Sequence, residues 1–497
     1  MSKNHHLTTR CGLRRQRSSL RGVAWMSLLG GALFLFAACP GPKRKSTPKG
    51  GGAPGGPGDE NSGLGVPTVK KTLNKKTRTL QKAEAQPQPI LGVMEKELQR
   101  TFAKLKAPGS PKPYFVAYTV DETQTVYMSA TLGTLNGFKR SKGRRLTVDM
   151  RVGSRKFDNT HFLERSFGSY GGSVPLEDDD KAVRTYLWLA SDRIYRRAVE
   201  ELERVKAKAK TSSKEEDDSA DFSSPVKLVY LSNPAQLNMD VDRWKKTLRS
   251  VSEVFRADPR LTGSSVVLRA WATTRFYVSS EGSRLQLPSV RYQVTVYAST
   301  QTKDGMTYKR HESAFAHDPG KLPSAEKLTA MAKKVAGDLE DLRKAPLAHP
   351  YEGPAIFQGK AAAVFFHEVF GHRMEGHRQK LRRFDQTFTK KLGQKVMPTF
   401  LSVYDNPLIY SINGEFLNGH YLVDDEAVKA QRVALVKDGV LKGFLMSRTP
   451  IKTHPQSNGH GRRSSGRTVV ARQGNLVIDS DRVVKYSDLR KRSRRHE

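Results

Sequence analysis

The stretch FFHEVFGHRMEGH, residues 365–377, holds side chains that could bind a metal ion and move a proton. His367 and His372 carry imidazole nitrogens, which are frequent ligands of zinc, and Glu368 directly follows the first histidine. In helical zinc sites with the spacing His-Glu-x-x-His, the glutamate is the general base of a hydrolytic reaction. Here the second histidine comes one residue later, so the spacing is His-Glu-x-x-x-His.

This longer spacing does not suit a regular helix. Residues four apart in an α-helix are separated by about 40° around the axis, whereas residues five apart are separated by about 140°. A π-bulge in the helix would bring His367 and His372 to one face, because it adds one residue to a turn. Alternatively, Gly371 could end the helix, so that His372 approaches from a turn. If neither irregularity is present, the two histidines are neighbours in sequence only.

The residues around this motif predict the helix that carries it. The segment before His367, GKAAAVFF, is almost wholly apolar and compatible with a helix, so we expect a buried helix there.

The motif and a second segment resemble the TldD/PmbA family of bacterial metalloproteases, also called modulators of DNA gyrase. The active subunit of that family carries His-Glu-x-x-x-His followed closely by a Glu-Gly pair, and the matching residues here are His367, Glu368, His372, Glu375 and Gly376. Residues 421–445, YLVDDEAVKAQRVALVKDGVLKGFL, resemble the family's Asp-Asp-Glu segment and the strand pair after it. The likeness runs from about residue 90 to the C-terminus and is strongest over 350–475.

The resemblance implies a zinc-dependent metallopeptidase that hydrolyses unfolded peptides with a metal-activated water. His367 and His372 would be the zinc ligands, and Glu368 would be the catalytic base. Family members work as dimers in which one subunit keeps the motif and the other has lost it, with the peptide entering as an extended strand between subunits. A homo- or heterodimer with another TldD/PmbA subunit is therefore expected. The name of the family implies no contact with DNA.

One part of the family pattern has no counterpart in this sequence. The family's third zinc ligand is a C-terminal cysteine, and no cysteine follows Cys39. We therefore expect either a truncated or frameshifted chain without the family's C-terminal part, or a different third ligand. The candidates are His377, His420, His454 and His460. A second hypothesis follows, in which the protein is a catalytically inactive exported lipoprotein that binds peptides or a partner subunit.

The N-terminus predicts export. Five arginines within residues 10–21 precede the apolar run GVAWMSLLGGALFLFAAC, which has the order of a secretory signal peptide. Its last residues, Phe36 to Cys39, resemble a bacterial lipobox, in which the cysteine receives the lipid. We expect a lipoprotein-type signal peptide over 1–38, lipidation at Cys39 and attachment to a membrane through the acyl chains. The protein would lie on the periplasmic or cell-envelope side.

The composition limits the other classes of function. The sequence of 497 residues has 86 Lys and Arg against 49 Asp and Glu, which gives a formal net charge of +37. No aromatic residues interleave the densest basic runs, as base stacking would require, so we expect no nucleic-acid partner. The two cysteines, Cys11 and Cys39, leave the folded part without disulfides.

The rest of the chain predicts an α+β fold of antiparallel sheets with flanking helices, in a two-part TldD/PmbA-like architecture. Residues 39–88 are rich in Gly, Pro and Lys and are expected to be a disordered tether. An N-terminal α+β domain is predicted over 89–322 and a metallopeptidase-like C-terminal domain, expected to be incomplete, over 323–497. Apolar periodicity predicts helices over 90–105, 181–210, 241–257 and 324–346, the last one opening the C-terminal domain. Alternation predicts strands over 114–120, 126–133 and 145–153, a hairpin turn at 279–282, and further strands within 397–407, 430–447 and 467–479, with a tight turn at 437–439.

Overall fold

The computed structural model describes residues 74–81, 85–106, 108–162, 169–211, 216–380, 386–464 and 466–494. The predicted signal peptide, Cys39 and most of the predicted tether lie outside these ranges. Within them, no helix has both the length and the apolar character that crossing a bilayer requires.

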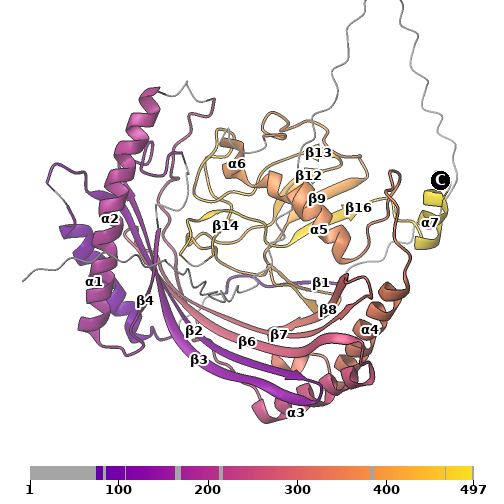
Figure 1. Cartoon of the computed structure of the whole chain (residues 1–497). Helices are drawn as coiled ribbons and strands as arrows, with labels where there is room; N and C mark the ends of the chain where they lie inside the picture. Colours follow the sequence, from indigo (N-terminus) through magenta and orange to yellow (C-terminus); the bar gives the residue numbers. More distant parts are fainter. Residues whose placement is uncertain are drawn as a thin grey trace, which may run out of the picture. The chain divides into compact units, whose positions relative to one another are not determined.

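The main element is a seven-stranded, mostly antiparallel sheet (Figure 1). Its strands are β2 (Pro113–Thr131), β3 (Thr134–Val152), β4 (Ser169–Val174), β5 (Val229–Leu231), β6 (Leu261–Ser279), β7 (Arg284–Gln301) and β8 (Thr307–Ala316). The order is β4-β3-β2-β6-β7, and both β8 and the parallel strand β5 pair with β7. Our predictions of strands over 114–120 and 126–133 correspond to one continuous strand, β2, because the polar residues between them lie on the same long ladders to β3 and β6.

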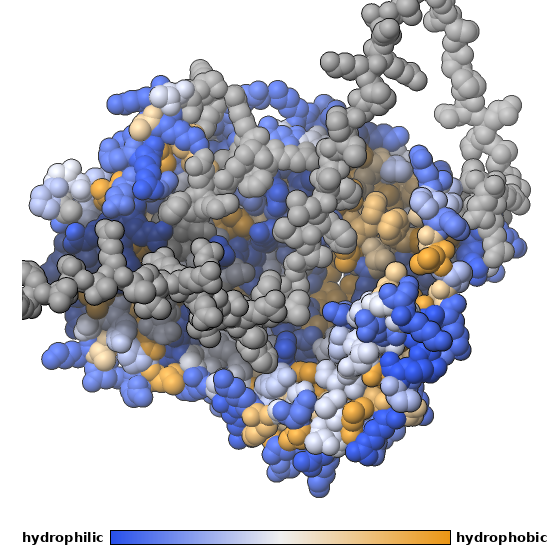
Figure 2. Space-filling model, in the orientation of Figure 1, coloured by the Kyte–Doolittle hydropathy of each residue, from blue (hydrophilic) through white to orange (hydrophobic). Residues whose placement is uncertain are grey.

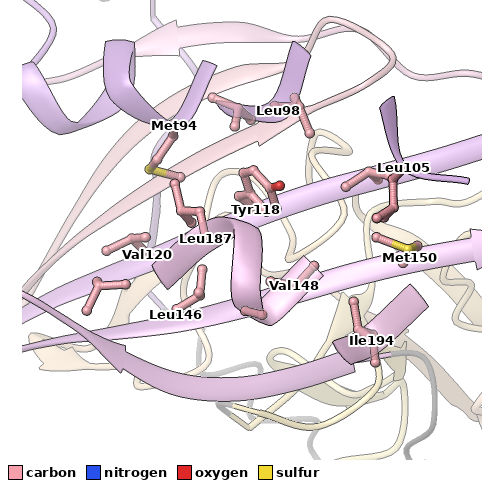
Figure 3. Packing of buried hydrophobic residues seen from close by; sticks show 14 of the residues in the cluster. Met94, Leu98, Leu105, Tyr118, Val120, Leu146, Val148, Met150, Leu187 and Ile194 are labelled. Atoms are coloured by element: carbon pink, nitrogen blue, oxygen red, sulfur yellow. The ribbon is translucent and has the colours of Figure 1, made fainter. Parts of the chain in front are cut away.

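Four helices cover one face of this sheet, in two groups. They are α1 (Pro89–Lys104), α2 (Asp180–Thr211), α3 (Val241–Glu253) and α4 (Ala325–Lys344), with short 3-10 turns η1 (Val254–Ala257) and η2 (Pro319–Lys321). Val116, Tyr118 and Val120 of β2 belong to a core with α1 and α2, which Figure 3 shows from close by. Val126 and Met128, further along the same strand, belong to a second core with α3 and α4. The side chains alternate along a strand, so these even-numbered residues share one face.

The packing of α4 differs from the prediction. We expected this helix to open the C-terminal domain at residue 323, but its apolar side, which includes Leu328 and Val335, packs in the core of β6 and β7. The helix therefore continues the helical layer of the large sheet, and the C-terminal elements begin after it.

Within the described residues, the C-terminal strands take part in three small sheets, which short helices accompany. The strands are β9 (Leu401–Asp405), β10 (Ile409–Ile412), β11 (Glu415–Phe416), β12 (Val433–Lys437), β13 (Val440–Leu441), β14 (Gly461–Arg462), β15 (Val470–Ala471) and β16 (Leu476–Ser480). The helices are α5 (Lys360–Val369), η3 (Gly371–Met374), α6 (Gly376–Lys380) and α7 (Tyr486–Arg494). The largest of these sheets has the order β13-β12-β9-β16.

Two local features of these sheets bear on the predictions. The tight turn predicted at 437–439 joins β12 to β13, and Asp438 and Gly439 both have positive φ angles, of 50° and 78°, as two-residue hairpin turns require. In addition, β1 (Lys75–Thr77) pairs with β10. These three residues belong to the segment 39–88, which we predicted to be a disordered tether. The prediction is therefore wrong for residues 75–77, which form a strand. The predicted class, α+β with antiparallel sheets and flanking helices, is confirmed.

The opposite face of the large sheet contacts the C-terminal elements through charged groups. Arg275 of β6 bonds to Asp121 of β2 and to Asp425, and Arg463 bonds to Asp149 of β3. These contacts hold the C-terminal sheets, and with them the candidate site, against the long strands.

Candidate metal centre

The irregularity that the histidine spacing requires lies at Phe370 and Gly371. Helix α5 ends at Val369, Phe370 has φ −115° and ψ −52°, and the chain continues from Gly371 as the 3-10 turn η3. His367 therefore lies in the last turn of α5, and His372 lies in the tighter turn after it. Of the two alternatives, the structure shows the helix end at Gly371 and not a π-bulge.

This break brings the two imidazoles together. Their ring centroids lie 4.6 Å apart with planes inclined at 75°. Glu368 lies between them, with one carboxylate oxygen 3.9 Å from Nε2 of His367 and the other 3.7 Å from Nε2 of His372. One ligand atom from each of the three residues falls within 4.8 Å of the others. The structure thus places the three predicted site residues in one cluster.

Two glycines permit the close packing around this turn. A Cβ at Gly371 would collide with the side chain of Gln473, whose amide also donates to the carbonyl oxygen of His367 at 3.4 Å. A Cβ at Gly376 would lie 2.8 Å from the carbonyl oxygen of Leu445 and collide with Met446. The second contact explains the Glu-Gly pair, because the amide of Gly376 donates to that same carbonyl oxygen at 2.8 Å.

Glu375 orients His372 through a hydrogen bond to its Nδ1 atom. Its carboxylate is fully buried and accepts a hydrogen bond from Nδ1 of His372 at 2.8 Å. It also accepts from Arg378 at 2.7 Å and from Arg472 at 3.0 Å. Burial raises the pKa of Glu375, but the hydrogen bond from His372 and the nearby cationic groups outweigh this effect and bring the pKa to about 2. The other ring nitrogen of His372, Nε2, lies 3.7 Å from a carboxylate oxygen of Glu368.

His367 is more exposed than His372, and its surroundings favour the neutral ring. Partial burial, and next the imidazole of His372, lower the pKa of His367. A neutral imidazole is the form that binds a metal ion.

Helix α5 itself is exposed, which corrects our prediction of a buried helix. None of its ten residues is buried, and Val364, Phe365 and Val369 are all largely exposed. Phe357, in the segment before the helix, stacks on Phe365 with ring centroids 4.8 Å apart. In Figure 2, orange atoms gather where Figure 1 draws α5 and the chain leading into it. The apolar sequence reflects a surface that is open in the single chain, and not a place in the core.

Residues 350–495, which include this site, match the sequence model of the PmbA/TldA metallopeptidase C-terminal domain. A metalloprotease of Methanocaldococcus jannaschii is 24% identical over 254 residues, which are 51% of this chain and 53% of that protein. A metalloprotease of Archaeoglobus fulgidus is 31% identical over 129 residues, or 26% of this chain and 28% of that protein. A metalloprotease TldD homologue of Haemophilus influenzae is 31% identical over 113 residues, or 22% of each chain.

The likeness to PmbA/TldD proteins in these comparisons includes the C-terminal part of the chain, residues 350–495. The chain spans about half the length of the first of these relatives and less of the other two. A solved structure described as a modulator of DNA gyrase from Bacteroides thetaiotaomicron has a TM-score of 0.52 and 10% identity, and covers 78% of this chain and 76% of its own. At this identity the likeness shows the fold alone.

The donor set fits a metal ion, which the name metalloprotease implies for the relatives. Two imidazole nitrogens and a carboxylate suit zinc, and Glu375 supplies the outer carboxylate that metal-binding histidines usually have. Within the described ranges, this group of His367, Glu368 and His372 is the one cluster of three such side chains close enough to hold an ion.

The four candidate third ligands do not belong to that cluster. His460 is fully buried and bonds to Asp405 at 3.1 Å, and the Nδ1 atom of His420 lies 2.8 Å from the carbonyl oxygen of Pro407. His454 lies beside Thr453 and over Phe444. His377 is buried, with Nε2 3.9 Å from Glu375.

Sequence reasoning gave no role to Glu375 or Arg472. Glu375 was part of the PmbA/TldD resemblance, and its spacing of three residues from His372 could have suggested the hydrogen bond, since such residues are neighbours on a helical turn. Arg472 is almost one hundred residues away, and no local pattern connects it with the motif. Cys39, the predicted lipidation site, lies outside the described residues.

Proposed function

We propose that this protein is an exported, lipid-anchored, zinc-dependent metallopeptidase of the TldD/PmbA type that hydrolyses unfolded peptides. The observation that carries the proposal is the meeting of His367, Glu368 and His372 at an exposed helix end. The curated relatives named metalloproteases, and the match to the metallopeptidase domain over 350–495, support the same reaction class.

Each residue of the cluster has a role that follows from its surroundings. His367 and His372 would hold the ion through nitrogens that carry lone pairs, and Glu375 keeps His372 in the required tautomer. Bound zinc would supply Lewis-acid polarisation of the substrate carbonyl and make water more acidic. The Glu368 side chain, 61% exposed, can accept a proton from water and pass it to the leaving amine.

A second function is favoured by the small donor set. Zinc sites use three protein ligands in enzymes and four in structural sites, whereas the described cluster offers two histidines and the proposed base. The alternative is therefore a catalytically inactive lipoprotein that binds peptides or a partner subunit at the same surface.

The proposed partners follow from the exposed helix and from the leader sequence. A second TldD/PmbA-type subunit, the same or different, would cover apolar side chains such as Val364 and Phe365, which α5 leaves exposed. Lipidation at Cys39 would attach the protein to a membrane.

Zinc binding and peptide cleavage test the two functions together. The purified chain is expected to bind about one zinc ion and to cleave an unstructured peptide, and His372→Ala is expected to lose both properties. Glu368→Gln is expected to keep the zinc and lose cleavage if Glu368 is the base. Loss of zinc from this variant would instead make Glu368 a ligand. A wild-type chain that binds peptide without zinc and without cleavage would replace the enzyme by the binding protein.

Membrane attachment has its own test. The wild-type protein, produced with its leader, is expected in the membrane fraction, and Cys39→Ser is expected to release it. An unchanged membrane fraction for Cys39→Ser would rule out the lipid anchor.

A further inference from the structure

Arg472 lies beside the proposed metal ligands although it is distant in sequence. Its Nη1 atom donates to Oε1 of Glu375 at 3.0 Å, and His372 Nδ1 bonds to the same oxygen at 2.8 Å. The guanidinium of Arg472 and the imidazole of His372 therefore share one hydrogen-bond acceptor, Oε1 of Glu375. On the other side, the adjacent residue Gln473 donates to the carbonyl oxygen of His367.

The backbone around Arg472 is held firmly in place. Its amide donates to the carbonyl oxygen of His460 at 2.9 Å. Two residues further on, the amides of Gly474 and Asn475 donate to the carboxylate of Asp405, and His460 Nε2 lies 3.1 Å from the same carboxylate. Asp405 and His460 are both fully buried. The side chain of Arg472 therefore projects from an anchored loop, which favours precise binding of a ligand.

Most donors of the Arg472 guanidinium group remain available. A guanidinium has five N–H donors, and in the part of the chain that the structure describes, the Arg472 side chain uses one of them, toward Glu375. The side chain is 44% exposed, so the other donors can reach a ligand from solvent. Arg378, which bonds to the other oxygen of Glu375, is 25% exposed and makes a further interaction.

Three basic side chains gather around the carboxylate of Glu375. The single carboxylate of Glu375 is in contact with two guanidinium groups, those of Arg378 and Arg472, and with the imidazole of His372. A divalent ion at His367 and His372 would add positive charge on this side of Glu375. An exposed cationic donor beside an electropositive site is suited to a carboxylate, which pairs with arginine through two parallel hydrogen bonds.

We propose that Arg472 forms a carboxylate-binding subsite beside the metal-binding histidines, so that the preferred peptides carry an anionic group near the cleaved bond. The inference rests on the proposed peptidase function and specifies its substrate. The carboxylate can come from the C-terminus of the peptide or from an Asp or Glu side chain, and in both cases Arg472 recognises the same group.

Peptide binding to the zinc-loaded Glu368→Gln protein tests this without catalysis. Three labelled unstructured peptides of otherwise equal sequence separate the sources: one with a C-terminal carboxylate, one amidated with an internal Glu, and one amidated and neutral. Adding Arg472→Gln is expected to weaken binding of at least one carboxylate peptide about tenfold or more, because charge-assisted hydrogen bonds are lost. Binding of the neutral peptide is expected to change less than about twofold.

Arg378→Gln is the matched control, because it also removes one guanidinium contact to Glu375. It is expected to change the affinities of all three peptides by the same factor. The subsite is disproved if Arg472→Gln changes all three affinities equally, or changes none of them. Repeating the titrations on the zinc-free protein separates the two proposals. Arg472-dependent preference for carboxylates in a chain that neither binds zinc nor cleaves peptides would leave the subsite standing and remove the peptidase.

Discussion

The candidate metal centre and the contact around Arg448 are built from similar side chains in opposite surroundings. His367 and Glu368 have side chains that are 49% and 61% exposed, on a helix with no buried residue. Arg448 is 1% exposed and donates through both terminal nitrogens to Glu281, at 2.7 and 3.0 Å. It also lies over the ring of Phe222, with the guanidinium carbon 3.8 Å from the centroid.

This difference in burial indicates that the Arg448 contact stabilises the fold, whereas the metal centre is placed to bind ligands. Arg448 joins the C-terminal elements to residues 222–224 and to the end of the long strands, so the fold depends on it. The metal centre contributes few buried contacts, because its groups must remain accessible to an ion and a substrate. We therefore expect changes at Arg448 to affect unfolding and changes at the centre to affect binding.

The largest effect on stability is expected for Arg448→Ala. The substitution leaves the carboxylate of Glu281 buried with Arg155 as its remaining cationic partner, and empties the space over Phe222. Breaking a buried pair in this way is expected to lower the free energy of unfolding by about 3–5 kcal/mol. Urea unfolding curves of the variant and the wild type measure this loss. Arg196→Ala, which removes an exposed pair with Asp192 on α2, is the control and should leave the unfolding free energy nearly unchanged.

Similar losses for Arg448→Ala and Arg196→Ala would show that the Arg448 contact does not hold the two regions together. In that case the Arg448 contact would not be the stabilising member of the comparison with the exposed metal centre.

The next effect belongs to the metal centre. Glu375→Gln replaces the carboxylate that fixes His372, so the ring is held less firmly in the tautomer with a free Nε2. Loss of such an outer partner lowers metal affinity about 10- to 100-fold, which zinc titration against a competing chelator measures. Asp192→Asn, which removes an exposed carboxylate of α2 outside the metal cluster, is the control and should leave zinc affinity unchanged. Unchanged zinc affinity in Glu375→Gln would mean that the carboxylate only neutralises Arg378 and Arg472.

The sequence predicted the elements of the fold better than their packing. Helices α1, α2, α3 and α4 and the hairpins were readable because apolar periodicity is local, and Gly439 marked its turn. The placement of α4 against β6 and β7 could not be predicted from the sequence, because one apolar helix face can pack on any apolar layer. The unbroken length of β2 was also hidden, because its central residues are polar: Asp121 bonds to Arg275 and Glu122 pairs with Arg144, so neither belongs to an apolar core.

At the site, the local part was predictable and the distant part was not. The helical angle between His367 and His372 required an irregularity, either a π-bulge or a helix end at Gly371, and the structure shows the second. The side chain that packs on Gly371 belongs to Gln473, and the guanidinium beside Glu375 belongs to Arg472. Contacts across such a separation depend on the tertiary fold, which no local spacing encodes. The exposure of α5 was mispredicted because an apolar sequence does not distinguish a helix in the core from one on an apolar surface where a partner could bind.

Acid is expected to weaken the contact between the large sheet and the C-terminal elements. Burial raises the pKa of the Asp425 carboxyl, but Arg275 and next Arg462 and Arg463 outweigh it and bring the pKa to about 2. A carboxyl whose folded pKa lies below its unfolded value of 3.8 adds stability that is fully present above that value. This stability is lost as the pH falls toward 2, and amounts to roughly 2 kcal/mol.

Unfolding curves at a series of pH values measure this dependence for Asp425. Asp425→Asn is expected to lower stability at pH 7 and to flatten its fall between about pH 4 and 2. Asp242, an exposed residue of α3 beside Lys245, provides the control, because Asp242→Asn should leave the acid branch of the curve unchanged. An equally steep acid branch in Asp425→Asn would assign the dependence to other carboxyl groups.

The smallest effect compares two valines on helices in the two regions. Val364 of α5 is 57% exposed, and Val183 of α2 is 1% exposed in the core with β2 and β3. Val183→Ala removes buried methyl groups and is expected to cost about 1–3 kcal/mol. Val364→Ala removes exposed ones, and alanine favours a helix more than valine does, so it should leave stability unchanged or raise it by a few tenths of a kcal/mol, roughly. A loss of more than about 1 kcal/mol for Val364→Ala would show that α5 is covered in solution, and a loss that grows with dilution of the protein would identify the cover as another subunit.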